Sequence, residues 1–224
     1  MSIAQNITKF NQVLPQRVKL VAVSKTKSNE DIMEAYQAGQ RIFGENKVQE
    51  LLQKWETLPK DIEWHFIGHL QSNKVKYLAP FISMIHAVDS VKLLNVIQAE
   101  GQRLDRKIPC LLQFHIAEEE SKFGFEPAAF NQLISTDDVA TFDHICFSGV
   151  MGMATFTDDV EIVNREFSDL SQLYGKLKST YFSEDANFME LSMGMSHDYQ
   201  QAIQNGSTMV RIGSSIFGDR NYTP

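Results

Sequence analysis

The stretch of sequence that decides the fold is VKLVAVSKTKSNEDIMEAYQAG, residues 18–39. Its first part, residues 18–24, is a short apolar run rich in valine, which is typical of a buried parallel strand. Ser28 then stands at a helix N-cap with Asp31 three residues later, and the helical pattern ends at Gly39. The stretch therefore predicts one strand, one short helix and the loop that joins them.

The same strand-then-helix pattern repeats along the chain. Most of its apolar runs begin 20 to 24 residues apart, with two longer steps of 36 and 44 residues, and the short step fits one strand, one helix and two loops. Eight such units predict an α/β fold, a single (β/α)8 TIM-type barrel in one domain spanning residues 1–224. The expected strands are residues 18–24, 41–45, 62–68, 84–88, 108–116, 144–151, 188–192 and 208–212.

Helix signals fill the spaces between these runs. Further helices are expected at residues 91–104, from Pro127 to Ile134, at 160–177, and at 198–203 before Gly206. A doubly wound sheet is the alternative fold. It usually carries G-x-G-x-x-G after its first strand, where this chain has VSKTK at residues 23–27. The barrel is therefore favoured.

The bulk composition argues against several classes of function. Hydrophobic residues make up 43% of the chain, enough for a sizeable core, and the net charge of -7 argues against nucleic acid as a partner. Cys110 and Cys146 lie in apolar runs without a C-x-x-C pair, so two buried, reduced thiols are expected. No signal-peptide pattern and no apolar run of the roughly 20 residues in a membrane span are present, so we expect a soluble, cytoplasmic protein without a membrane partner.

Lys25 is the first candidate for chemistry, because active sites of barrels form at the C-terminal ends of the strands. Partial burial there would lower the pKa of its ammonium from about 10.4 and free the amine to attack carbonyl groups. The alternative is an ordinary lysine at a strand end that reaches water. Lys27 is either the solvated lysine or a second cation for an anionic ligand.

Two loops rich in glycine and serine follow the seventh and eighth runs. SMGMS (192–196) and IGSS (212–215) would expose backbone N–H groups at helix N-termini, and barrels commonly bind phosphate in these two loops. Ordinary turns of small residues are the alternative for either loop alone, but the two together favour a phosphate site. Arg211 lies between this site and Lys25, where it would contact a ring nitrogen or carboxylate of a ligand, or pair with an acidic side chain.

Other features are weaker candidates. His65 and His69 have the spacing of a helical zinc site, but four residues of strand span roughly 13 Å, too far for one metal ion. The acidic run 118–120 is expected to be a solvated turn. The methionines that flank glycines are expected to pack the mouth of the barrel: Met151, Met153, Met193 and Met195.

Eight stretches, spread in order through nearly the whole chain, form a specific set. They are VAVSKTKSNEDI (21–32), FGENKVQE (43–50), WHFIGHLQSNKVK (64–76), HAVDS (86–90), ESKFGF (120–125), SGVMGMAT (148–155), LSMGMSHDYQQAI (191–203) and VRIGSSIFGDR (210–220). This set resembles the pyridoxal phosphate homeostasis proteins (YggS/PROSC-type), which share the barrel of the alanine racemase N-terminal domain.

The resemblance implies a cofactor and a role for each candidate residue. Lys25 would hold pyridoxal 5'-phosphate (PLP) as a Schiff base, Arg211 would face the pyridine nitrogen, and Asn46 would lie beside the ring. Such an arginine disfavours a protonated ring nitrogen and so weakens the electron sink that transaminases use. The phosphate would be held by Ser192 with the backbone that follows it and by the loop after the eighth strand: Ser192, Met193, Gly213 and Ser214.

The sequence also departs from the family pattern in places. Phe114 and His115 stand where the family often has an apolar residue and an asparagine, and His69 occupies a variable position. His115 is therefore a residue that could enter the pocket. None of the departures touches the lysine or phosphate motifs.

Racemases of this barrel class carry a second, β-rich domain that supplies a tyrosine base. The present chain ends at Pro224, just after the eighth strand, which leaves no room for such a domain. We therefore expect a protein without robust catalysis, a PLP carrier or buffer in vitamin B6 homeostasis, with apo forms of PLP-dependent enzymes as candidate recipients. No obvious exposed apolar helix demands a dimer, so we expect a monomer. A weak amino-acid racemase and a cofactor-free Schiff-base aldolase are the alternatives.

Overall fold

The computed structural model describes residues 1–118, 123–126, 130 and 138–218 of the chain. Eight parallel strands close into a barrel in sequential order, and β8 lies beside β1 in a register that pairs Met209 with Lys19. The predicted α/β barrel is therefore confirmed. The strands are β1 Lys19–Val23, β2 Ile42–Glu45, β3 Glu63–Phe66, β4 Met84–Val88, β5 Ile108–Gln113, β6 Ile145–Met151, β7 Glu190–Met195 and β8 Met209–Ile212.

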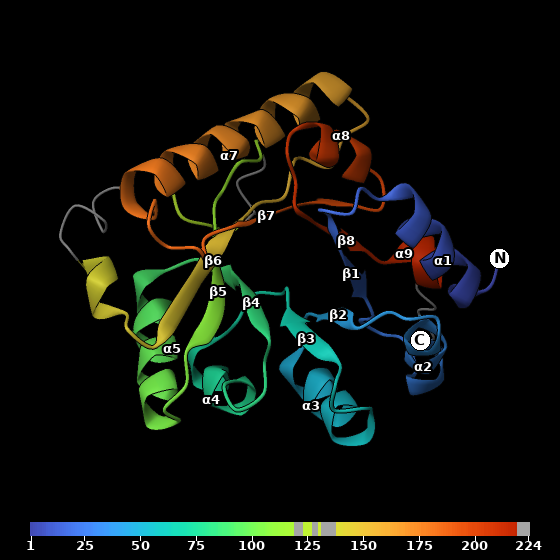
Figure 1. Ribbon diagram of the computed structural model, residues 1–224, viewed down its shortest axis with the longest axis horizontal. Helices are drawn as coiled ribbons and strands as arrows, with labels where there is room; N and C mark the ends of the chain where they lie inside the picture. The colour runs from blue at the N-terminus through green and yellow to red at the C-terminus, as the bar shows by residue number, and fades with distance from the viewer. Residues whose placement is uncertain (119–122, 127–129, 131–137, 219–224) are drawn as a thin grey trace.

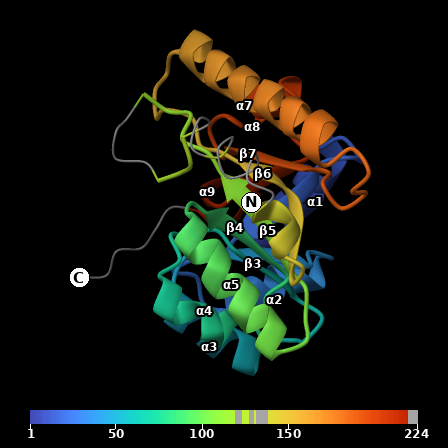
Figure 2. The same cartoon turned by 90° about the vertical axis from the view of Figure 1, so that its left-hand side faces the viewer.

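Helices surround the strands. Figures 1 and 2 show α3, α4 and α5 on one side of the barrel and α7 with α8 on the opposite side. The helices are α1 Ile3–Val13, α2 Asn29–Gln37, α3 Val48–Thr57, α4 Val75–Leu78, α5 Val91–Arg103, α7 Val160–Tyr181, α8 Tyr199–Gln204 and α9 Ser214–Phe217, with short 3-10 turns η1 Ser72–Lys74 and η2 Asp138–Thr141.

The strands are buried on both faces, as parallel strands in a barrel must be. Every residue of β4, for example, is buried. Side chains on the outer face of the strands pack with the helices into one large apolar cluster. A smaller, separate cluster consists of inward-facing residues: Val21, Met84, Ala87, Leu111, Met151 and Met209.

The boundary of the seventh strand differs from the prediction. A strand at residues 188–192 is expected, but β7 continues to Met195, so the prediction that the strand ends at Ser192 is wrong. Gly194 has a φ of 96°, and a Cβ there would lie 2.6 Å from the Cβ of Ala202 in α8. Gly194 therefore does not begin a loop; it allows α8 to pack closely on the strand. Ser192 and Met193 consequently lie inside β7.

One predicted helix start is confirmed, and one helix was missed. Ser28 and Asp31 form a capping box at the start of α2, as expected. Residues 3–13 form α1, for which no helix is predicted; Ser2 caps it, and Asn6 Nδ2 donates to the carbonyl oxygen of Ile216 over 2.9 Å. The helix expected from Pro127 to Ile134 lies outside the described residues except at position 130. The acidic run 118–120 lies outside them except at position 118.

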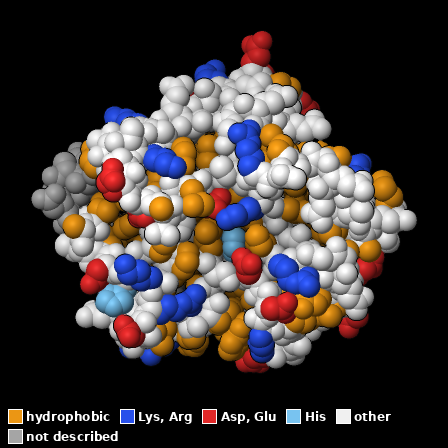
Figure 3. All heavy atoms as spheres, in the orientation of Figure 1, with side chains coloured by type: hydrophobic (Ala, Val, Ile, Leu, Met, Phe, Trp, Pro, Cys, Tyr) orange, Lys and Arg blue, Asp and Glu red, His pale blue; other side chains and the backbone are white. Residues whose placement is uncertain are grey.

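Three expectations from composition meet the structure here. Cys110 is a buried free thiol whose pKa is raised by burial, whereas the free Cys146 is only partly buried, contrary to expectation. Within the described ranges, no helix combines the length and apolar composition needed to cross a membrane. On the face shown in Figure 3, acidic and basic side chains are interspersed and do not gather into one basic patch.

Candidate functional site

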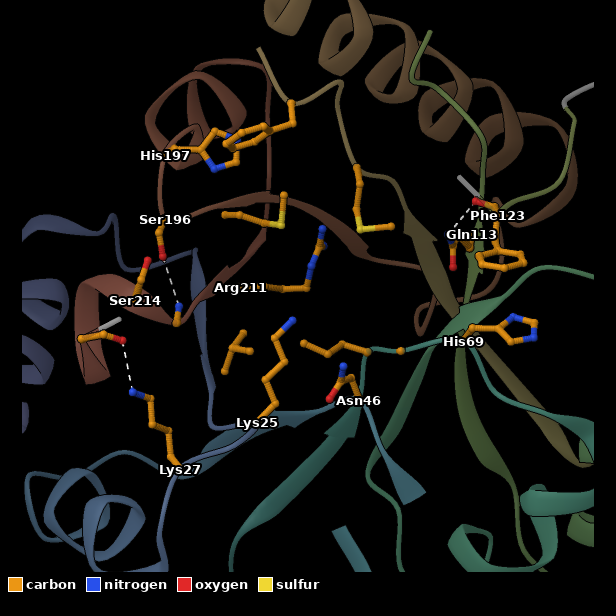
Figure 4. Close-up of a pocket in the computed structure, with 18 residues that line it drawn as sticks. Lys25, Lys27, Asn46, His69, Gln113, Phe123, Ser196, His197, Arg211 and Ser214 are labelled. Carbon is orange, nitrogen blue, oxygen red and sulfur yellow. Dashed lines mark hydrogen bonds between the residues drawn. The ribbon is translucent and has the colours of Figure 1, made fainter. Parts of the chain in front are cut away.

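A cavity of about 490 Å³ opens where the strands end (Figure 4). Its walls come from the C-terminal ends of β1, β2, β3, β5, β6, β7 and β8 and the residues that follow them. Five of the seven predicted site residues line it: Lys25, Asn46, Arg211, Gly213 and Ser214. Ser192 and Met193 are not among the lining residues.

Lys25 lies in the cavity wall just beyond the end of β1 and is half-buried. Figure 4 shows its side chain extending toward Arg211. The backbone turns at the next residue, Thr26, which has a φ of 66° and donates its N–H to Glu50 Oε1 over 2.6 Å. A positive φ is unfavourable for a non-glycine residue, so this turn needs stabilising contacts. The hydrogen bond to Glu50 supplies one, and it thereby stabilises the turn that carries Lys25.

Lys27 lines the same cavity but is engaged elsewhere. Its amine donates to the carbonyl oxygens of Phe217 and Gly218, over 3.0 and 3.2 Å. These carbonyls belong to the end of α9 and the residue after it. The side chain therefore ties the turn after β1 to the C-terminal end of α9.

A buried ionic cluster supports the turn after β1. The Lys54 amine donates to the Ser24 carbonyl over 2.9 Å, to Glu45 Oε1 over 2.8 Å and to Glu50 Oε1 over 2.6 Å. The Ser24 hydroxyl also donates to Glu45 Oε1, over 2.6 Å. Burial raises the pKa of Glu45, although Lys54 acts in the opposite direction. The cluster thus connects α3 and β2 to the backbone on either side of Lys25.

Asn46 reaches the cavity directly after β2. Figure 4 shows its side chain between Lys25 and His69. The neighbouring Gly68 is constrained by this arrangement, because a Cβ there would lie 2.6 to 2.8 Å from Asn46 atoms. A glycine at position 68 therefore allows the loop after β3 to pack against the asparagine.

A polar cradle lies where the loops after β7 and β8 meet. Gly213 donates its N–H to Ser196 Oγ over 3.2 Å, and both residues line the cavity together with Ser214. Ser192 and Met193 are fully buried within β7. The serine of the SMGMS motif that reaches the cavity is thus Ser196, since β7 extends three residues beyond its predicted end.

Arg211 contributes a buried cation to the cavity wall. It is 4% exposed and donates to Ser192 Oγ over 2.7 Å and to the Gly152 carbonyl over 3.0 Å. Burial lowers the pKa of its guanidinium to about 10, so the side chain stays charged at neutral pH. Among the described residues, no carboxylate forms an ion pair with it.

Comparisons with known proteins decide the family. The family described as "Alanine racemase, N-terminal domain" matches residues 1–221. The pyridoxal phosphate homeostasis protein of Pasteurella multocida is 38% identical over 237 residues, covering 100% of both chains. This chain belongs to the pyridoxal phosphate homeostasis protein family.

Solved structures of similar fold agree with this family assignment. PipY of Synechococcus elongatus is 32% identical, and its structures without and with PLP bound superpose with TM-scores of 0.90 and 0.87, each covering 97% of this chain and 100% of PipY. The alanine racemase of Bartonella henselae, 17% identical with a TM-score of 0.73, covers 99% of this chain and 60% of its own. At that identity the racemase shares the barrel fold alone.

In this member of the homeostasis family, two aromatic pairs stand at the rim of the cavity. His69 stacks on Phe123 with ring centroids 4.4 Å apart, and its Nδ1 lies 3.0 Å from Asp89 Oδ2. Phe156 meets His197 edge-on at 5.1 Å. Phe123 and Phe156 are 55% and 77% exposed, so the rim presents apolar surface to solvent.

The aromatic pairs at the rim and the Lys54 cluster were not predicted from the sequence. The Glu50 and Lys54 spacing of four residues was the available signal for a helical ion pair, but their contacts with the backbone of Ser24 and Thr26 depend on tertiary packing. His115 does not line the cavity; its Nδ1 lies 3.4 Å from Glu126 Oε1. Within the part of the chain that the structure describes, no His, Cys, Asp and Glu cluster could hold a metal ion.

Proposed function

We propose that this chain binds PLP in the cavity at the end of the barrel and carries or buffers it for vitamin B6 homeostasis. One observation carries the proposal: an amine, a cation and the polar cradle line a single cavity. Lys25 supplies the amine and Arg211 the cation, and the cradle consists of Ser196, Gly213 and Ser214. The relatives named above support this reading, because PipY is a family member with PLP bound.

The donor set matches three functional groups of PLP: the aldehyde, the ring nitrogen and the phosphate. A cavity of about 490 Å³ lies within the range of small-ligand sites. Hydroxyl groups suit a phosphate, and the Ser196 hydroxyl, which accepts from the Gly213 N–H, keeps its own proton to donate. We place the phosphate at Ser196, Gly213 and Ser214, the ring beside Asn46, and the ring nitrogen toward Arg211. Ser192 and Met193, predicted as phosphate contacts, would act from behind the cavity wall.

Lys25 is the residue that we propose to bond the cofactor covalently. Its neutral amine attacks the aldehyde carbon, one C=N bond forms, and one water molecule leaves. The ionic cluster of Lys54, Glu45 and Glu50 would hold the backbone of this Schiff-base lysine in place through Ser24 and Thr26. The lysine thereby acts as an anchor on a rigid strand end.

The surroundings of the anchor favour holding over turnover. PLP supplies an electron sink when its ring nitrogen is protonated. A charged guanidinium at that nitrogen donates a hydrogen bond and opposes protonation. Among the described residues that line the cavity, there is no tyrosine, aspartate or glutamate to serve as a second base.

Weak racemisation of amino acids is the second candidate function. His69 and His197 lie on opposite sides of the cavity mouth (Figure 4), where either ring could exchange a proton with a bound amino acid. Incubation of the purified protein with PLP and several L-amino acids tests this candidate. Enantiomer exchange at enzyme-like rates would favour it over the carrier function.

A spectroscopic titration tests the main proposal. The purified protein is titrated with PLP, and the visible absorption band of the Schiff base is followed in three forms: wild type, Lys25→Ala and Lys47→Ala. Lys47 is an exposed lysine next to Asn46 that does not line the cavity, and it serves as the matched control. We expect the band in the wild type and in Lys47→Ala and its loss in Lys25→Ala. A band that persists in Lys25→Ala contradicts the proposal.

Three further statements stay proposals. We propose that residues 1–224 form one PLP-binding domain, that the protein is a cytoplasmic monomer, and that apo forms of PLP-dependent enzymes receive the cofactor. Transfer of PLP from the loaded protein to such an apo-enzyme, followed by the enzyme's recovered activity, checks the last of them. An apo-enzyme that recovers no faster than with free PLP at the same concentration counts against it.

A further inference from the structure

A continuous chain of buried polar side chains runs through the barrel behind Arg211. Ser192 Oγ lies 2.7 Å from an Arg211 nitrogen and 3.2 Å from His86 Nδ1. His86 Nε2 lies in turn 2.9 Å from His65 Nδ1. The four residues are between 0% and 4% exposed. They come from β8, β7, β4 and β3, so the chain crosses the interior of the barrel.

Arg211 imposes a direction on this chain. A guanidinium has only donors, so the Ser192 oxygen must accept from it. The buried Ser192 proton then needs an acceptor, and His86 Nδ1 is the other partner of this hydroxyl among the described residues, so His86 Nδ1 is assigned the accepting lone pair. The His86 proton therefore sits on Nε2 and is donated to His65 Nδ1. By the same step His65 carries its own proton on Nε2.

Both imidazoles must be neutral for the chain to close. A protonated His86 would carry a hydrogen on Nδ1 and could no longer accept from Ser192. Burial lowers the pKa of His65 to about 3, and burial, with the neighbouring charges, also lowers the pKa of His86. The far end of the chain reaches a second cavity of about 250 Å³ at the N-terminal ends of the strands, which His65 lines with Lys19 and Glu190.

We propose that His86, backed by His65, is a positioning residue for Arg211 and acts on it through the Ser192 hydroxyl. The inference rests on the proposed function, because Arg211 is the cation that would meet the ring of PLP. A neutral acceptor chain holds the guanidinium in place and leaves its charge uncompensated. A carboxylate partner would instead neutralise that charge. The full positive charge of Arg211 therefore remains available to the cavity.

The first experiment measures the tautomers directly and needs no cofactor. In the PLP-free protein labelled with nitrogen-15 at histidine, we expect His65 and His86 to be neutral and protonated on Nε2. We expect the Nδ1 resonance of His86 to shift in Ser192→Ala, because its hydrogen-bond donor is gone. A proton on His86 Nδ1 in the wild type, or an unchanged Nδ1 resonance in Ser192→Ala, overturns the inference.

The second experiment measures the dissociation constant of PLP in matched variants. We expect Ser192→Ala and His86→Leu to weaken binding about tenfold, the effect of losing one hydrogen bond to a charged group. His86→Asn should bind within about threefold of wild type, because its amide oxygen can replace Nδ1 as the acceptor. Ser207→Ala is the control: Ser207 is an equally buried serine that bonds only backbone carbonyls.

The outcomes separate a positioning role from a structural one. Equal losses in Ser192→Ala and Ser207→Ala, or wild-type affinity in His86→Leu, overturn the inference. If His86→Leu does not fold, the comparison of Ser192→Ala with Ser207→Ala decides. If the wild-type protein fails to bind PLP, the proposed function falls, while the tautomer measurement still decides whether the chain has the stated direction.

Discussion

The backbone N–H of Gly213 donates to the hydroxyl of Ser196 over 3.2 Å, and this contact joins the loop after β8 to the loop after β7. The two loops are 17 residues apart in sequence but form one wall of the cavity. A ligand phosphate at this wall would meet a hydroxyl donor from each loop, Ser196 after β7 and Ser214 after β8. The cradle therefore depends on both loops and not on either motif alone.

Ser196→Ala should weaken the binding of PLP about tenfold, because one hydrogen bond to a charged phosphate is lost. Pyridoxal, which has the same ring and aldehyde but no phosphate, should bind the variant and the wild type equally. Fluorescence titration with both ligands gives the comparison. An equal loss of affinity for both ligands would show that Ser196 acts on the ring or on folding and not on the phosphate.

Lys54→Met should destabilise the protein by about 3 to 5 kcal/mol, because Glu45 and Glu50 would lose the cation that they share in a buried site. The free energy of unfolding in urea measures the effect. Lys47→Met, on the exposed face next to Asn46, is the control and should stay within about 0.5 kcal/mol of wild type. Similar stabilities for the two variants would contradict the role given to the cluster.

The turn after Lys25 should accept glycine and reject proline. Thr26 has a φ of 66° and donates its N–H to Glu50, whereas proline has a fixed negative φ and no N–H. Thr26→Pro should therefore abolish PLP binding or folding, and Thr26→Gly should preserve both. Circular dichroism and PLP titration of the two variants check this. Wild-type binding in Thr26→Pro would show that the turn does not position Lys25.

Stability should fall in acid because of the buried histidines. The pKa of His65 is about 3 in the folded protein, below its ordinary value of 6.5, so the unfolded chain binds more protons between these pH values. The contribution of neutral His65 to the free energy of unfolding is fully present above about pH 6.5. It is lost as the pH falls toward 3, by about 1.4 kcal/mol per pH unit for this one group.

Urea unfolding of the wild type and of His65→Asn between pH 7 and pH 4.5 measures this slope. The asparagine can still accept from His86 Nε2 but does not titrate. The slope of the free energy of unfolding against pH should therefore be smaller in this variant, by the amount that one titrating proton contributes. Parallel curves for the two proteins would mean that His65 is not the buried neutral group described above.

The alternation of apolar runs and helix signals was sufficient to predict the barrel, and the rule about strand ends directed attention to Lys25, Asn46 and Arg211. Local sequence could not set the end of β7. Its Gly194 looks like the start of a loop, but it is required by the close approach of Ala202, a contact that depends on where α8 packs. Ser192, which the family resemblance implies as a phosphate contact, therefore lies inside β7, and Ser196 lines the cavity.

Side chains that act across the barrel were beyond the reach of local patterns. His65 and His86 are 21 residues apart on neighbouring strands, and Ser192 lies 106 residues from His86. Their contact follows from strand register, which periodicity does not determine to within one residue. The same holds for Lys54, whose partner Ser24 follows β1 and whose partner Glu45 ends β2.

The covalent anchor is the central claim, and chemical trapping tests it most directly. The protein is incubated with PLP, reduced with borohydride and digested, and the modified peptide is located by mass spectrometry. The account predicts a pyridoxyl group on Lys25 and no comparable label on Lys27 or Lys54. Modification chiefly at another lysine, or none at all under conditions in which PLP binds, would contradict it.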